Sequence, residues 1–413
     1  MNVRELALSA KAASGKLSIT SAQTRNDALL AMADALLTAA PVILAANAED
    51  VKNAKECNVK ESFIDRLTLD QKRIEGMANG MKKVALLHDP IGKSDSVTVH
   101  PNGMRIEKRR VPLGVIGIIY EARPNVTADA IALCIKSGNA CVLRGGSEAL
   151  LSNSAITDAL NAAAVKSGIP DGAIQLLRDT DRATAAEMMK LNGLIDVLIP
   201  RGGAGLIRSV VQQATIPVIE TGSGVCHVYI DETADLTMAA DIIENAKCSR
   251  PSVCNAAETL LVHQSVAKDC LPQIAKRLTA RGVELRCDTR AKALMPGTID
   301  ATEEDWSTEY NDLILSVKVV DSFDEAVAHI ETYGTHHSDA IVTSLITTAE
   351  RFLNEVNSAA VYVNASTRFT DGEEFGFGAE IGISTQKIHA RGPMGLDELT
   401  TVKYTIRGSG QIR

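Results

Sequence analysis

A loop at positions 249–255 brings a cysteine together with an arginine and an asparagine, residue types that suit nucleophilic catalysis. The loop reads Ser-Arg250-Pro-Ser-Val-Cys254-Asn255 and follows a strand-like run at 226–231 and a helical run at 236–248. The thiolate is the attacking form of cysteine, and neighbouring cations and backbone N–H groups lower the pKa of a thiol from about 8.5. Cys254 is therefore our candidate nucleophile. The alternative is a small buried apolar residue, as most cysteines are.

A second candidate for chemistry is Asn125. It ends the segment Tyr120-Glu-Ala-Arg-Pro-Asn125, which follows an apolar strand and precedes a helical run. Asparagine often caps a helix, so Asn125 could have that role. Its amide could equally donate a hydrogen bond to an oxyanion. The sequence leaves both roles open.

Two glycine-containing loops are candidates for binding phosphate. They are Arg144-Gly-Gly-Ser147 and Arg201-Gly202-Gly203-Ala-Gly205, and each follows an apolar strand and leads into a helical run. Flexible glycines before a helix N-terminus expose N–H groups, which together with the helix dipole favour an anion. Neither loop matches GxGxxG, so a dinucleotide here would not bind in the usual Rossmann manner. Both loops could also be ordinary tight turns.

The elements that carry these residues follow from the hydrophobic period. Residues 2–88 repeat apolar side chains every three or four positions, which predicts helices. Between 95 and 110 the period changes to two around Pro101-Asn102-Gly103, which predicts a β-hairpin with an Asn-Gly turn. Residues 401–407 alternate in the same way. Because two strands alone are not stable, we expect this tail strand to join the hairpin or its copy in another subunit.

From about 113 to 220, short apolar runs alternate with helical runs, which predicts a parallel sheet covered on both faces. The predicted strands are 115–119, 140–143, 195–199 and 217–219, and the predicted helices are 126–137, 147–166, 182–192 and 204–214. A second series from 226 to about 364 predicts a second α/β domain with the cysteine loop at its mouth. Residues 287–312 are irregular and acidic and are expected to be mostly surface loop.

Composition limits the class of protein. With 413 residues, 45% hydrophobic and 23% charged, the chain is globular and long enough for two or more domains. A net charge of −8 argues against nucleic acid or an anionic membrane as the main partner, and 3% aromatic residues argue against a platform for stacking bases. The eight cysteines show neither a CxxC pair nor zinc-ligand spacing, which predicts free thiols in a reducing compartment and no metal site.

Targeting and membrane segments are not expected. The first residues carry charges and no following apolar core, unlike a signal peptide. The longest apolar stretch, 28–46, is broken by Asp34 and Pro41. We interpret it as amphipathic helix rather than as a membrane span.

Together, the loop cysteine, the hairpin with its tail strand, the Asn125 segment and the α/β series resemble the aldehyde dehydrogenase superfamily. Within it, the chain resembles the gamma-glutamyl phosphate reductases over nearly all its length. The most specific signature is VDSFDEAVAHIETYGTHHSDAI at 320–341, and ETGSGVCHVY at 220–229 and RPSVCNAAET at 250–259 also fit. In the first signature we interpret His329 and His337 as structural rather than catalytic. One departure is that Asn125 follows its proline directly.

The resemblance implies an α/β, aldehyde dehydrogenase-like fold with two parallel-sheet domains and a small β-hairpin oligomerisation element. It implies an NADP-binding domain at 1–94 and 112–225, the oligomerisation element at 95–111 and 399–413, and a catalytic domain at 226–398. It also implies a small-molecule substrate, a homo-oligomer, a cytoplasmic location and transient contact with glutamate 5-kinase, without nucleic acid or membrane as partners.

The implied reaction is NADPH-dependent reduction of L-glutamyl 5-phosphate to L-glutamate 5-semialdehyde and phosphate through a Cys254 thioester, the second step of proline biosynthesis. The Asn125 amide and the Cys254 N–H would hold the oxyanion, and Glu220 stands where hydrolysing relatives carry a general base. The implied cofactor residues are Arg144, Ser147, Gly202, Gly203 and Glu309. Near the leaving phosphate the candidates are Arg123 and Arg250, and for the substrate α-carboxylate they are Ser366 and Arg368.

Other readings remain open at this point. Glu309 could be a solvated loop acid instead of a partner of the nicotinamide ribose. The protein could be an NAD(P)-dependent aldehyde dehydrogenase that hydrolyses its thioester to an acid. It could also be a non-catalytic relative with a structural or regulatory role.

Overall fold

The computed structural model describes residues 2–57, 59, 61–121 and 123–413, which form two compact units. The first unit contains Met1–Thr221, Gly376–Gly382 and Met394–Arg413, and the second contains Gly222–Phe375 and Ile383–Pro393. From the sequence we expected the boundary between the two large domains after residue 225. The chain leaves the first unit at 221 and returns to it twice near the C-terminus.

The first unit is built on a parallel sheet with the strand order β5-β4-β3-β6. Its strands are β3 (Val115–Tyr120), β4 (Ala140–Arg144), β5 (Ile174–Leu176) and β6 (Val197–Arg201). Three of the four predicted strands are confirmed, whereas 217–219 makes only an isolated bridge between Val218 and Leu198. The strand β5 was not predicted, because three residues are too short to show a period.

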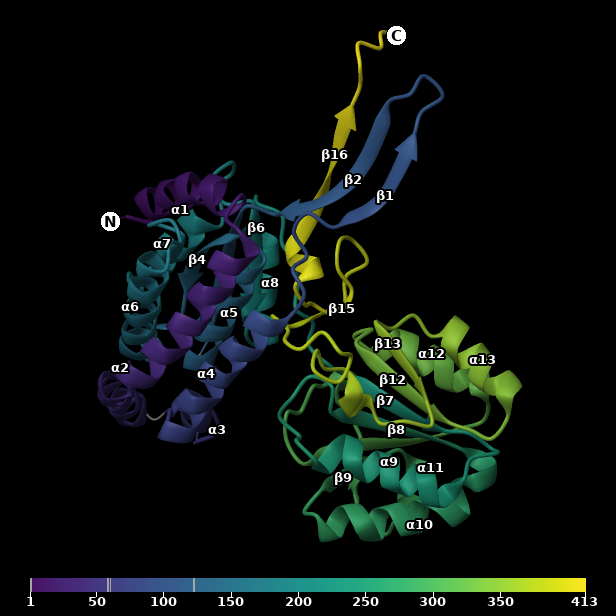
Figure 1. The fold of residues 1–413 in the computed structure, drawn as a ribbon. Coiled ribbons are helices and arrows are strands. Elements are labelled where there is room, and N and C mark those ends of the chain that lie inside the picture. Colours follow the sequence, from purple (N-terminus) through teal and green to yellow (C-terminus); the bar gives the residue numbers. More distant parts are fainter. Residues whose placement is uncertain (1, 58, 60, 122) are drawn as a thin grey trace. The chain divides into compact units, whose positions relative to one another are not determined.

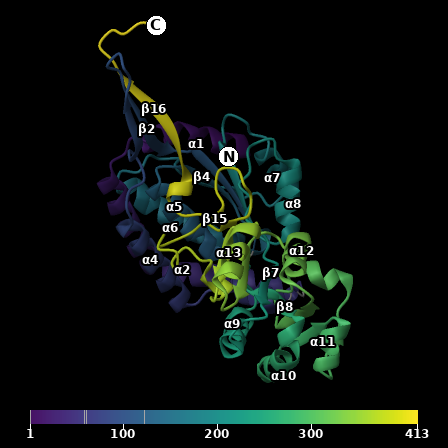
Figure 2. The ribbon, with the colours of Figure 1, turned by 90° about the vertical axis from the view of Figure 1, so that its right-hand side faces the viewer.

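Helices cover this sheet (Figures 1 and 2). On one face α5 (Pro124–Lys136) and α6 (Leu150–Lys166) pack against the strands, and α1 (Val3–Leu17) and α7 (Arg182–Met188) contact each other on the other face. An outer layer of α2 (Ala22–Glu56) and α4 (Gln71–Leu86) packs against α5 and α6. The remaining elements are α3 (Glu61–Leu67), η1 (Ser147–Ala149), α8 (Ala204–Gln213) and η4 (Asp397–Leu399). The helical prediction for the N-terminal region is confirmed.

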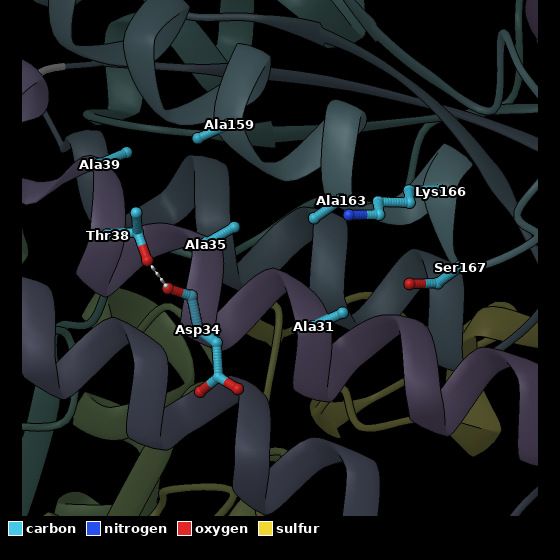
Figure 3. Close-up of a pocket in the computed structure, with 9 residues that line it drawn as sticks. All are labelled: Ala31, Asp34, Ala35, Thr38, Ala39, Ala159, Ala163, Lys166 and Ser167. Carbon is cyan, nitrogen blue, oxygen red and sulfur yellow. Dashed lines mark hydrogen bonds between the residues drawn. The ribbon is translucent and has the colours of Figure 1, made fainter.

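By length and composition alone, α2 could cross a membrane, but one such helix is weak evidence. Its buried residues pack inside the first unit, where Arg25 Nη2 donates to Asp89 Oδ2 at 2.6 Å and Asn47 Nδ2 donates to the Leu67 carbonyl at 2.9 Å. Where α2 meets α6, a groove is lined by Ala31, Asp34, Ala35, Thr38, Ala39, Ala159, Ala163, Lys166 and Ser167 (Figure 3). Most of these side chains are small, which lets the two helices approach closely.

A three-stranded antiparallel sheet completes the first unit. It has the order β1-β2-β16 and consists of β1 (Ser94–Val99), β2 (Arg105–Pro112) and β16 (Thr400–Arg407). The predicted hairpin is confirmed, and the tail strand joins the hairpin of its own chain, with Thr400 opposite Pro112 and Arg407 opposite Arg105 (Figure 1).

The second unit is built on a parallel sheet with the order β10-β9-β11-β8-β7-β12-β13. Its strands are β7 (Cys226–Ile230), β8 (Ala257–His263), β9 (Glu284–Cys287), β10 (Ile299–Asp300), β11 (Ile314–Val320), β12 (Ser338–Val342) and β13 (Ala360–Val363). Its helices are α9 (Leu236–Cys248), α10 (Gln264–Ala280), α11 (Thr289–Leu294), α12 (Phe323–Tyr333) and α13 (Ile346–Glu355). Short elements are η2 (Glu303–Ser307), η3 (Thr367–Phe369), β14 (Ile383–Ser384) and β15 (Gly392–Pro393).

Alternate residues of the central strands enter two separate cores, one on each face of this sheet. Val228 and Leu260 pack with α9 and α10, whereas their neighbours Tyr229 and Leu261 pack with α12 and α13 (Figure 1). The predicted second α/β domain with a parallel sheet is confirmed.

The prediction that 287–312 is mostly loop is wrong. The segment contains α11, β10 and η2, and the buried Asp305 organises its second half. Asp305 Oδ2 accepts the N–H of Thr302 at 2.7 Å, and Oδ1 accepts Arg286 Nη1 at 2.7 Å. Asp305 thus bonds to the protein itself, so the second half of the segment is ordered without a hydrophobic period.

Candidate active site

Cys254 lies in the loop between α9 and β8 as a half-buried cysteine that forms no disulfide bond. Residues just before and at the start of β7 pack against the backbone of this loop. Gly224 lies so close that an added Cβ would be 1.5 Å from the Cys254 carbonyl oxygen. The thiol of Cys226 donates to the same oxygen at 3.2 Å. The backbone of the candidate nucleophile is therefore fixed by two residues of the ETGSGVCH segment.

Asn255, directly after the cysteine, ties the loop to η3. Its Nδ2 donates to the carbonyls of Arg368 at 3.3 Å and Thr370 at 2.9 Å, and its own carbonyl accepts Thr367 Oγ1 at 2.7 Å. In return, Arg368 Nη1 donates to Asn255 Oδ1, and Arg368 Nε donates to Ser249 Oγ at 3.0 Å. One guanidinium thus holds both ends of the cysteine loop. A cation beside a thiol favours the thiolate.

The two signature histidines are buried in the second unit. Burial lowers the pKa of His337 to about 4, and its Nδ1 lies 2.8 Å from Ser338 Oγ and 3.8 Å from Cys226 Sγ. Burial also lowers the pKa of His329 to about 2, and its ring packs edge-on against Trp306. Both rings are therefore neutral near pH 7.

Glu309 is fastened next to the start of β7. Its Oε1 accepts the Gly224 N–H at 2.8 Å, so it is not a freely solvated loop acid. The N–H of Asn311, two residues after Glu309, donates to Glu258 Oε1 at 3.4 Å. Burial raises the pKa of Glu258 to about 8, and this carboxyl pairs with the fully buried Lys247 of α9. The Glu309 loop is thereby anchored to both α9 and β8.

In the first unit, Asn125 is the second residue of α5, whose N-cap is the half-buried Arg123. Asn125 therefore does not cap the helix. Its exposed Nδ2 donates to Asp129 Oδ2 at 3.3 Å. Burial raises the pKa of Asp129 to about 6, against the opposing effects of the Asn125 bond and of Arg201. The amide nitrogen of asparagine carries two hydrogens, and Asp129 accepts one of them. The second N–H can donate a hydrogen bond to an oxyanion.

Arg144 and Ser147 lie at the carboxyl end of β4. Arg144 Nη2 donates to the Thr180 carbonyl at 3.2 Å, and its buried Nε has no partner among the described residues. Ser147 is exposed at the first position of η1. A guanidinium with unused N–H groups beside an exposed hydroxyl fits the phosphate and ribose of an adenosine cofactor.

The second glycine loop holds a carboxylate of the chain itself. The Gly203 N–H donates to Glu121 Oε2 at 2.9 Å, and a Cβ added at Gly202 would lie 2.5 Å from the same oxygen. The N-terminus of α8 thus binds an anion, as its N–H groups and dipole favour, but this anion is Glu121. A cofactor phosphate at the exposed Gly202 and Gly203 would require Glu121 to move.

Three other predicted residues have different settings. Glu220 is half-buried at the end of the first unit. Ser366 is buried and its Oγ accepts the Arg368 N–H at 3.3 Å, so a capping role in η3 accounts for it. Arg250 is exposed in the cysteine loop. In the second unit, Arg250 and Cys254 belong to one loop, and Arg368 bonds to Ser249 and Asn255 at the ends of that loop.

Three comparisons with known proteins bear on this arrangement. The profile of the Aldehyde dehydrogenase family matches residues 1–303. The chain is 60% identical to the gamma-glutamyl phosphate reductase of Caldanaerobacter subterraneus subsp. tengcongensis over 413 residues, which is 100% of each chain. The crystal structure of the gamma-glutamyl phosphate reductase from Thermotoga maritima matches with a TM-score of 0.97 and 48% identity over 100% of each chain. This chain is a member of the gamma-glutamyl phosphate reductases of the aldehyde dehydrogenase family.

As a member of the aldehyde dehydrogenase family, the chain is an oxidoreductase, and the predicted fold class is confirmed. An acetylating aldehyde dehydrogenase from Geobacillus thermoglucosidasius shares the fold, with a TM-score of 0.71 and 19% identity over 100% of this chain and 97% of that one. Within the described ranges, no group of three or more His, Cys, Asp or Glu is placed to hold a metal ion.

Sequence reasoning missed three residues of this family member that contact predicted site residues. Cys226 bonds the Cys254 carbonyl, Glu121 bonds Gly203, and Asp129 accepts from Asn125. Only Asp129 had a local signal, since it lies four positions after Asn125, on the same face of a helix. Cys226 and Glu121 reach their partners through the tertiary fold.

Proposed function

We propose that the protein reduces L-glutamyl 5-phosphate with NADPH to L-glutamate 5-semialdehyde and phosphate, the second step of proline biosynthesis from glutamate. The observation that carries this proposal is the Cys254 loop, a half-buried thiol with a guanidinium bonded across both ends of its loop. Full-length identity of 60% to a gamma-glutamyl phosphate reductase supports this substrate over other acyl phosphates.

The residues have separate roles in this chemistry. The Cys254 thiolate attacks the acyl carbon, and phosphate leaves with the electron pair of the broken C–O bond, which gives a thioester. The Cys254 N–H and the Asn125 amide are the proposed donors to the oxyanion. A bound nicotinamide would supply the hydride that reduces the thioester, after which the thiohemiacetal on Cys254 releases the aldehyde. Of the substrate candidates, Arg123 would contact the leaving phosphate, and Ser366 would support the turn that carries Arg368.

Cofactor contacts are proposed for both units. Arg144 and Ser147 would hold the adenosine end, and Glu309 the nicotinamide ribose. Gly202 and Gly203 would contact the pyrophosphate once Glu121 has moved away.

Replacing Arg144 with alanine should raise the KM for NADPH about tenfold and change the KM for NADH much less, because a guanidinium binds phosphate oxygens in a bidentate way. The measurement is steady-state kinetics with both cofactors. Arg178→Ala is a matched control, since this exposed arginine of the same unit pairs with Asp158. Equal effects of Arg144→Ala on NADPH and NADH would show that Arg144 does not contact the 2′-phosphate.

The oxidative direction tests the proposed function as a whole. With glutamate semialdehyde and NADP⁺, sustained NADPH formation should require inorganic phosphate, because phosphate must attack the thioester to regenerate the enzyme. Without phosphate, in a non-nucleophilic buffer, we expect at most a burst near one equivalent per active site. Arsenate should replace phosphate, since it attacks the same thioester.

Two alternatives make different predictions in that experiment. A hydrolysing dehydrogenase, with a residue such as Glu220 as general base, would sustain turnover without phosphate and yield glutamate. A non-catalytic relative would give neither burst nor turnover. Either result would refute the proposed function.

Assembly and location are also part of the proposal. The β1-β2-β16 sheet leaves Val97, Val99, Tyr404 and Ile406 exposed, which supports its use in forming a homo-oligomer. The eight cysteines form no disulfide bonds among the described residues, which supports a cytoplasmic location. Transient contact with glutamate 5-kinase would protect the labile acyl phosphate. Nucleic acid and membranes are not proposed as partners.

A further inference from the structure

Arg368 presents a guanidinium whose orientation is fixed before any ligand binds. Nε and one Nη1 hydrogen are used by Ser249 and Asn255. Asn255, only 4% exposed, is itself held by the carbonyls of Arg368 and Thr370. A guanidinium has five N–H donors, and among the described residues none accepts from Nη2. Three donors therefore remain for a ligand.

A second cation shares this region. Burial lowers the pKa of Arg368, and the like charge of Arg250 lowers it further, whereas Asp371, Cys254 and Cys226 raise it. Arg250 directly follows Ser249, whose Oγ accepts Arg368 Nε at 3.0 Å, so both arginines belong to the region of the Cys254 loop. Like charges in a partly buried place repel one another, and an anion that accepts from both relieves that repulsion. A dianion with several acceptor oxygens suits two guanidinium groups better than a carboxylate does.

We propose that Arg368 and Arg250 form the subsite for the phosphate group, both as the 5-phosphate of the substrate and as free inorganic phosphate in the reverse reaction. This assignment rests on the proposed function. The sequence suggested that Arg368 binds the α-carboxylate of the substrate, whereas we now assign Arg368 to the phosphate group. The reason is position: Arg368 bonds the residues at the two ends of the Cys254 loop. The phosphate is joined to the reacting carbon by a single bridging oxygen, whereas the α-carboxylate lies at the far end of the glutamyl chain.

The step that this subsite serves involves no oxidation. The sulfur electron pair of Cys254 forms the C–S bond, and the C–O bond breaks with its electron pair remaining on the phosphate oxygen. The two arginines stabilise the charge that the departing phosphate gains. In reverse, they hold inorganic phosphate while one of its oxygens attacks the thioester carbon and the thiolate leaves.

Arg368→Gln tests the assignment. In the oxidative direction we expect the KM for inorganic phosphate to rise about tenfold or more, because charge-assisted hydrogen bonds are lost, with the KM for glutamate semialdehyde changed by less than about twofold. Arg250→Gln, at an exposed position outside the Asn255 network, should show the same split if Arg368→Gln fails to fold. Arg351→Gln is the matched control, since this arginine of the same unit is half-exposed and paired with Glu355.

A second measurement does not depend on turnover. Mass spectrometry can follow alkylation of Cys254 by iodoacetamide with and without inorganic phosphate. Phosphate should slow alkylation of Cys254 in the protein with the original sequence and in Arg351→Gln. In Arg368→Gln, phosphate should no longer slow alkylation. A raised KM for the semialdehyde with an unchanged KM for phosphate, or full protection in Arg368→Gln, would overturn the subsite. Sustained turnover of the unmodified enzyme without phosphate would instead refute the proposed function, so the two failures are distinguishable.

Discussion

Replacing Cys254 with serine is expected to lower turnover by about 10³-fold or more, because a serine hydroxyl in this loop remains protonated and does not form the thioester. The fold should persist. The contacts that fix this residue involve its carbonyl oxygen, which accepts from Cys226 and lies against Gly224, and serine keeps both. The measurements are NADPH formation with glutamate semialdehyde, NADP⁺ and phosphate, together with the thermal unfolding temperature.

Cys248→Ser is the matched control for this experiment. Cys248 is the last residue of α9, six positions before Cys254. Burial raises the pKa of the Cys248 thiol, which keeps it protonated and poorly nucleophilic. The variant should retain turnover. An essential Cys248 with a dispensable Cys254 would show that the nucleophile is assigned wrongly.

Asn125→Ala is expected to lower kcat by about 10²–10³, or roughly 3–4 kcal/mol, as for the loss of other oxyanion donors. The structure sharpens this expectation, because Asn125 is exposed and is not the N-cap of α5. Its removal costs the helix no side-chain cap, and within the part of the chain that the structure describes the bond lost is the one to Asp129. The unfolding temperature should therefore change little while kcat falls.

Asn125→Asp is an informative companion variant. It has nearly the same shape, but its carboxylate donates no hydrogen bond and repels both Asp129 and an oxyanion. We expect kcat at least as low as in Asn125→Ala. A normal kcat with a lowered unfolding temperature in both variants would give Asn125 a purely structural role.

Much of the fold could be predicted from the sequence, because the hydrophobic period is a local property. The helical run 236–248 is α9 with the same bounds, and the change of period at 95–110 marks the hairpin. The cysteine loop was also recognisable, since its cysteine, arginine and asparagine lie within the short stretch 249–255. Prediction failed where local period is absent: β5 is too short, and 287–312 is held by polar bonds such as those of Asp305.

The tertiary structure decided which side chains meet. The residue that bonds the Cys254 carbonyl is Cys226, the anion at Gly203 is Glu121, and the guanidinium across the cysteine loop is Arg368. The partners in these contacts lie 28 to 113 positions apart, so no spacing along the chain reveals them. The sequence by itself determined most of the helices and strands and the reactive residue types. The fold determined their neighbours, because a side-chain hydrogen bond depends on distance in space and leaves no period in the sequence.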